Sequence, residues 1–176
     1  MTFNHYKISL LDANASEAFY NLIDNNRSRL EDFFAGTVSK TKTLEEALEY
    51  CKHIEHRIAE QSYFPFMIID ENTNEFAGLI DVKNIDWAIP KAELGAFIDS
   101  DYEGKGIVTE ATKLVVEHIV ETYKFKKLLC RAASVNKGSI SVILKNGFEL
   151  EGTIRRDYKT TKGEVVDLNY YGRIFN

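Results

Sequence analysis

Apolar residues recur at helical spacing in three stretches of the chain, and each stretch predicts an amphipathic helix. The first covers Ala15–Ile23, with Asn14 as its predicted cap, and the second begins at the capping-box sequence Thr43–Glu46 and ends near residue 61. The third lies within 107–119, and a short fourth helix is expected over about 137–145. The third has the most regular apolar face and is the clearest helix of the chain.

Short runs of branched and aromatic apolar residues predict strands between these helices. They are Lys7–Leu11, Phe64–Asp70, Phe76–Ile85, Lys91–Asp99, Leu128–Ala133, Phe148–Tyr158 and Val165–Tyr171. Polar residues at Glu71–Asn74 and Thr160–Gly163 mark two hairpin turns. Because helices and strands do not alternate strictly, the order predicts an α+β fold with a mixed sheet.

Composition narrows the class of protein. With 176 residues, 44% of them hydrophobic, the chain can bury one sizeable core, so residues 1–176 are expected to form a single domain. No signal peptide is recognisable and no stretch approaches the ~20 apolar residues of a membrane span, which makes a cytoplasmic location the default expectation. The net charge of −5 argues against a protein that binds nucleic acid through phosphate neutralisation, and it suits a basic substrate better.

Cysteine and histidine residues give no indication of a metal site. Cys51 and Cys130 have no closely spaced partner and are expected to be reduced, buried thiols. Cys51, His53 and His56 share a predicted helix, but no His-Glu-x-x-His sequence and no further ligand accompany them. We therefore expect no metal.

The strongest functional signal is a turn with two glycines between a predicted strand and the clearest helix. Gly104 and Gly106 allow a sharp turn and a close approach to a ligand, and the first N–H groups of a helix lack intrahelical partners. Such a turn favours a bound phosphate group. Neither the spacing nor the hydroxyl of a Walker loop fits Gly104–Ile107, and Thr109 replaces the third glycine of a dinucleotide fingerprint.

Two separated motifs resemble those of the GNAT superfamily of N-acetyltransferases. Asp101–Gly106 resembles the family's loop Gln/Arg-x-x-Gly-x-Gly/Ala, with an aspartate in place of the first residue. Downstream, Asn136–Ser139 resembles the Asn-x-x-Ser motif, and Gly147–Phe148 resembles the family's terminal Gly-Phe. Upstream, Asp24–Leu30 and Ala92–Gly95 look like the branch that contains RimJ and RimL, which acetylate N-termini of ribosomal proteins.

This resemblance implies an α+β GNAT-type fold. Its mixed, mostly antiparallel sheet of about seven strands would be flanked by helices and splayed between the fourth and fifth strands, where acetyl-CoA, the implied co-substrate, would lie. Amides around Phe97 and Ile98 would face the pantetheine arm and the thioester, and Asn136 would contact the pantetheine. The pyrophosphate would be held by the amides of Gly104, Lys105, Gly106, Ile107, Val108 and Thr109.

The resemblance also implies two catalytic residues. Glu93 stands where several GNAT enzymes place the carboxylate that removes the amine proton, although it can also be read as a solvated carboxylate beside Lys91. Ser139 is the expected acid for the departing thiolate, because Ile143 occupies the position of the tyrosine used by many members. Asn136 and Ser139 can equally be read as caps of the short helix.

The function implied is acetyl transfer from acetyl-CoA to a primary amine, by direct transfer in a ternary complex. The expected acceptor is the α-amine of a protein N-terminus of ribosomal-protein type. A polyamine or antibiotic amine is the alternative acceptor, and a non-catalytic acyl-CoA-binding module is the alternative class. Phe33, Phe34 and Trp87 are expected either at the acceptor entrance or in the core, and a homodimer through the C-terminal hairpin is a family-level expectation.

Overall fold

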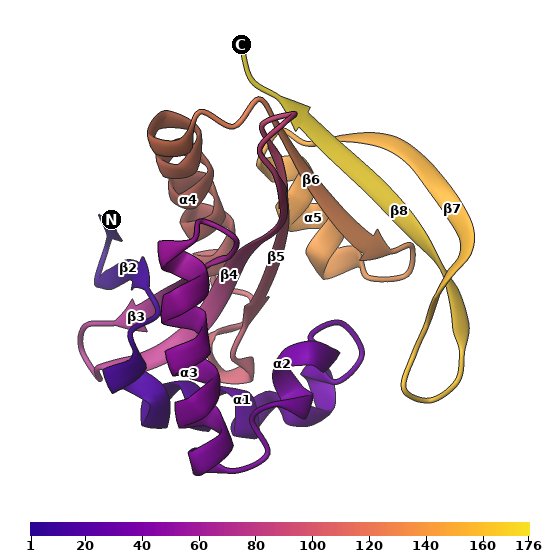
Figure 1. Cartoon of the computed structure of the whole chain (residues 1–176). Coiled ribbons are helices and arrows are strands. Elements are labelled where there is room, and N and C mark those ends of the chain that lie inside the picture. The colour runs from indigo at the N-terminus through magenta and orange to yellow at the C-terminus, as the bar shows by residue number, and fades with distance from the viewer.

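A computed structural model describes all 176 residues. One sheet of eight strands runs through the molecule in the order β1-β2-β3-β4-β5-β6-β8-β7 (Figure 1). The strands are β1 (Thr2–Phe3), β2 (Tyr6–Leu10), β3 (Phe64–Asp70), β4 (Glu75–Asp86), β5 (Lys91–Ile98), β6 (Lys127–Ala133), β7 (Glu149–Lys159) and β8 (Val165–Ile174). All pairs are antiparallel except β5–β6, which is parallel.

Five α-helices flank the sheet, with α3 in front of it and α4 behind it in Figure 1. They are α1 (Ser16–Leu30), α2 (Ala35–Ser39), α3 (Leu44–Ala59), α4 (Ile107–Tyr123) and α5 (Lys137–Lys145). Short 3₁₀ turns precede α1 at Ala13–Ala15 and follow β5 at Ser100–Tyr102. None of the helices combines the length and the apolar composition of a membrane span.

Two apolar clusters hold these layers together, one on each face of the sheet. The larger cluster packs α4, through Ala111, Val115 and Ile119, against one face. The smaller packs α1 and α3, through residues such as Phe19 and Ile54, against the other face. Alternate residues of β3 and β4 enter the two clusters, as expected for strands that are covered on both sides.

The predicted α+β sheet flanked by helices is confirmed, with β1 and α2 as additional elements. Thr43 caps α3 as predicted, since its side chain accepts from Glu46 N–H at 3.2 Å. The prediction that Asn14 caps α1 is wrong. The 3₁₀ turn before α1 makes Asp12 the capping residue, whose carboxylate accepts from Asn14 N–H at 2.7 Å, and Ala15 occupies the N-cap of α1 without a side-chain bond.

Candidate active site

The sheet opens between β5 and β6, the fourth and fifth of the predicted strands. The two strands pair only from Lys91–Lys127 to Leu94–Cys130, and beyond these pairs they separate, as Figure 1 shows. A cleft of about 700 Å³ occupies the opening and reaches residues on both faces of the sheet. Of the predicted site residues, it is lined by Glu93, Phe97, Ile98, Gly104, Gly106, Val108, Thr109, Asn136 and Ser139.

The loop with two glycines forms one end of the cleft. Gly104 and Gly106 have φ of +73° and +75°. These values lie in the left-handed region, which residues other than glycine adopt only with strain. Five consecutive N–H groups, from Gly104 to Val108, donate to no acceptor in the protein. Because the positive end of α4 lies behind these donors, the loop can bind a pyrophosphate.

Two predicted loop residues have side chains outside the cleft. Lys105 Nζ donates back to Asp101 O at 2.9 Å and lies over the ring of Tyr102. The side chain of Ile107 is buried in the core beneath α4. Both residues can therefore contribute backbone N–H groups to the loop, whereas their side chains have other roles.

The backbone of β5 offers further donors to the cleft. Asp99 N–H donates to Ala77 O on β4, and bonds to a given neighbour involve alternate residues of an antiparallel strand. Phe97 therefore directs its N–H to β4, whereas Ala96 and Ile98 direct theirs toward β6, where strand pairing has ended. These two amides can donate to the carbonyl oxygen of a thioester bound in the opening.

A buried polar network fixes the start of the loop to α1. Asn26 is fully buried, donates to Asp99 Oδ2 at 2.5 Å and accepts from Ser100 N–H. Arg29 donates to Ile98 O and forms an ion pair with Glu103. Neither Asn26 nor Arg29 is among the site residues predicted from the sequence. A polar residue on the apolar stripe of α1 is the signal that could have revealed Asn26.

Glu93 is engaged on both carboxylate oxygens. Arg131 Nε donates to Oε1 at 3.0 Å, and Asn84 Nδ2 donates to Oε2 at 2.9 Å. The Glu93 side chain is only 13% exposed, and Lys91 pairs with Asp86 instead. Glu93 thus lies in the cleft as half of an ion pair, which it would have to loosen in order to accept a proton from an amine.

Asn136 and Ser139 lie together at the start of α5. Asn136 is the N-cap, and its Oδ1 accepts from Ser139 N–H at 3.0 Å. The Ser139 hydroxyl has no hydrogen-bond partner in the protein and lines the cleft, so it is free to donate to a bound group. Ile143 is buried against the same cleft and offers no acid.

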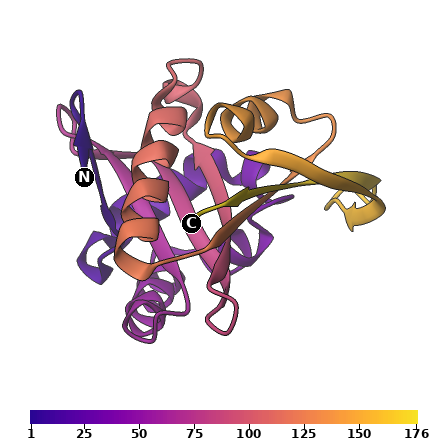
Figure 2. The ribbon, with the colours of Figure 1, turned by 90° about the horizontal axis from the view of Figure 1, so that it is seen from above.

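The far side of the cleft is bordered by α1, the turn that follows it, and the hairpin of β7 and β8, which projects from the body of the molecule in Figure 2. Phe33 stacks on Tyr158 with ring centroids 5.4 Å apart, and Asp32 Oδ1 accepts from both N–H and Oγ1 of Thr161 at 2.7 Å.

Phe34 also lines the cleft, whereas Trp87 stacks on Phe125 away from it. The two phenylalanines therefore border the cleft and Trp87 does not.

Cys130 is the one thiol in the cleft wall. Burial raises the pKa of Cys130 to about 12, so the group stays protonated near neutral pH and is a poor nucleophile. A covalent acyl-thiol intermediate on this residue is therefore disfavoured. Cys51 is buried between α3 and the sheet, with its pKa likewise raised to about 12 by burial.

The profile of the acetyltransferase (GNAT) domain matches residues 8–149 of this chain. The chain therefore belongs to the GNAT family and is an N-acetyltransferase that uses acetyl-CoA. The free amides of the loop and the opening in the sheet fit that co-substrate.

Similar proteins include acetyltransferases with two kinds of acceptor. The chain is 30% identical to the putative ribosomal N-acetyltransferase YdaF of Bacillus subtilis over 95% of its own length and 90% of the relative's. It is 29% identical to the spermidine N(1)-acetyltransferase of Escherichia coli over 77% of its length and 69% of the relative's. Among solved structures, RimL, a ribosomal L7/L12 α-N-protein acetyltransferase in complex with coenzyme A, superposes with a TM-score of 0.90 at 20% identity, covering 99% of this chain and 97% of that one.

Proposed function

We propose that this enzyme acetylates the α-amine of a protein N-terminus, of the kind found on ribosomal proteins, by direct transfer in a ternary complex. Acetyl-CoA supplies the activated acetyl group. The observation that supports its binding is the row of five free N–H groups from Gly104 to Val108. We further propose that Asn136 contacts its pantetheine arm and that Ile98 N–H donates to the thioester oxygen.

The charges in the cleft favour a peptide over a polyamine as acceptor. The cations that line it are Arg29, Lys83, Arg131 and Lys145, and the carboxylates are Glu93 and Glu103. Both carboxylates are already paired with arginine. A polyamine carries several positive charges and would need several free carboxylates along the cleft, whereas a peptide presents one amine and uncharged amides. The overall charge of −5 is therefore no guide to this site.

Direct competition tests this acceptor assignment. We expect a short peptide that begins with serine to be acetylated with a kcat/KM at least about tenfold above that of spermidine, a difference of ~1.4 kcal/mol in transition-state stabilisation. Thiol release measures both reactions under the same conditions. A preference for spermidine would overturn the peptide assignment and leave the acetyl-CoA site unaffected.

Calorimetric titration of acetyl-CoA tests the loop. A Gly106→Val variant places a branched side chain at φ +75°, so the loop must change shape and affinity should fall by about tenfold or more. Gly163→Val is the matched control, because Gly163 also has positive φ (+85°) but lies in the turn between β7 and β8. Equal affinities for the wild type and the Gly106→Val variant would show that the loop does not hold the pyrophosphate.

A further inference from the structure

A buried carboxylate, that of Asp81, lies beside the cleft and has no role in binding acetyl-CoA. Asp81 of β4 pairs in register with Gly95 of β5, so both residues face the side of the sheet that α1 and α3 cover. A Cβ atom on Gly95 would collide with Asp81 Oδ1 and lie 2.7 Å from Lys83 Nζ. The carboxylate therefore lies directly over Gly95, which lines the cleft together with Lys83.

The hydrogen bonding of Asp81 is incomplete. The residue is 3% exposed, and its Oδ1 has no partner in the protein. Its Oδ2 receives only two long bonds, from Tyr63 Oη and from Lys83 Nζ, each at 3.3 Å. A buried polar atom that loses its water without gaining a partner destabilises the fold, so such atoms are rarely left unpaired. A free carboxylate oxygen at this place therefore favours a ligand that donates a hydrogen bond.

Lys83 lies between this carboxylate and the cleft. Its side chain is 25% exposed and lines the cleft, whereas the Asp81 side chain behind it is 5% exposed. The ammonium also lies 5.2 Å from the centre of the Phe34 ring, whose face can hold a cation when it leaves the carboxylate. The flexible four-carbon stem of lysine allows such a movement.

We propose that Asp81 binds the acceptor nitrogen, and that the acceptor displaces the Lys83 ammonium toward Phe34. An N–H group of the acceptor then donates to the free Oδ1 above Gly95. This assignment rests on the proposed function, and it explains the glycine at position 95, since any side chain there would occupy the place of the nitrogen. Because one carboxylate has room for one cationic nitrogen, the site favours acceptors that present a single amine.

Steady-state kinetics of two variants tests the proposal, with a serine-initiated peptide as the acceptor probe. Asp81→Asn should raise the KM for the peptide roughly ten- to hundredfold, the loss expected for a hydrogen bond to a charged group, and leave the KM for acetyl-CoA within about twofold. Lys83→Met removes the competing ammonium and should lower the peptide KM several-fold. A merely structural ion pair would produce neither the split between the two KM values nor the gain.

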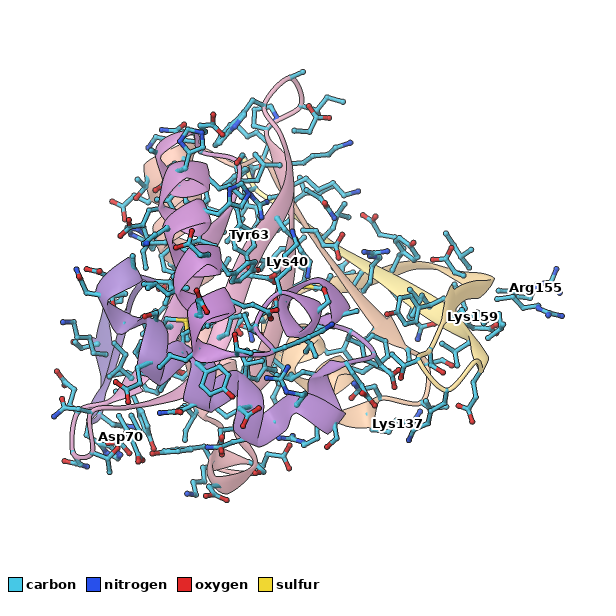
Figure 3. All side chains as sticks on the ribbon, turned by 60° about the horizontal axis from the view of Figure 1, so that its bottom comes forward. Lys40, Tyr63, Asp70, Lys137, Arg155 and Lys159 are labelled. Carbon is cyan, nitrogen blue, oxygen red and sulfur yellow. The ribbon has the colours of Figure 1, made fainter.

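Asp70→Asn is the matched control, because Asp70 is also a buried strand carboxylate (6% exposed) but lies far from Tyr63 in Figure 3. It should leave the peptide KM unchanged. An unaltered peptide KM in Asp81→Asn would overturn the proposal, and if that variant fails to fold, an unaltered or raised KM in Lys83→Met would overturn it. A wild-type enzyme that acetylates no peptide would instead refute the proposed function, which separates the two failures.

Discussion

At the scale of single residues, burial controls the protonation of both thiols. The pKa values of Cys51 and Cys130 are raised to about 12 in the folded protein from an ordinary value of 9.0. As pH rises above about 9, the unfolded chain loses these protons before the folded protein does. The stability that the buried thiols contribute is therefore present below pH 9 and is lost between about pH 9 and pH 12.

We accordingly expect the free energy of unfolding in urea to fall across this alkaline range. A variant with Cys51→Ala and Cys130→Ala should show a flatter dependence over the same range, because two of the groups responsible are gone. Equal slopes for the variant and the wild type would mean that other groups, such as the buried Tyr63, whose pKa burial also raises, account for the effect.

Ser139 gives a second prediction at this scale. Its hydroxyl has no partner in the protein, so Ser139→Ala should leave the unfolding free energy within about 0.5 kcal/mol of the wild type. If the hydroxyl protonates the departing thiolate, kcat should fall about 10²- to 10⁴-fold while acetyl-CoA still binds. Thiol-release kinetics measures kcat, and calorimetric titration measures the binding of acetyl-CoA. Full turnover in the variant would remove Ser139 from the mechanism.

At the scale of elements, α5 depends on one cap. Asn136 Oδ1 satisfies an otherwise free N–H group of the first turn, so Asn136→Ala should cost ~1 kcal/mol of unfolding free energy. Asn136→Asp retains a capping oxygen and should restore the stability. If the side-chain amide also donates to the pantetheine, acetyl-CoA affinity will remain low in the Asp variant, and titration of both variants separates the two roles.

The elements also show what the sequence could predict. Periodic apolar positions predicted α1, α3 and α4, because helices that pack on a sheet present one apolar face to it. The five-residue α2 lacks such a stripe and was missed. Within the cleft, the glycine loop was recognisable from its local turn, whereas the close approach of the Asp81 carboxylate to Gly95 depends on the register of two strands, which no local pattern reveals.

At the scale of the whole molecule, the opening in the sheet leaves two parts joined by few strand contacts. The part formed by β6, β7 and β8 pairs with the rest of the sheet only through residues 91–94 of β5. A ligand that fills the opening contacts both parts, so acetyl-CoA should slow amide hydrogen exchange in β6 and β8 more than in β2 and β3. Exchange measured with and without acetyl-CoA checks this, and uniform slowing would show that the sheet opens as one unit.

The opening between β5 and β6 is walled by two parts of the chain that are synthesised one after the other. The glycine loop, the helix behind it and the network from Asn26 to Asp99 are complete once residue 123 has left the ribosome. The opposite wall, with Cys130 and Ser139, comes from chain that is made later. Since a domain generally folds as a unit, the phosphate-binding loop is synthesised well before the cleft can be completed by its second wall.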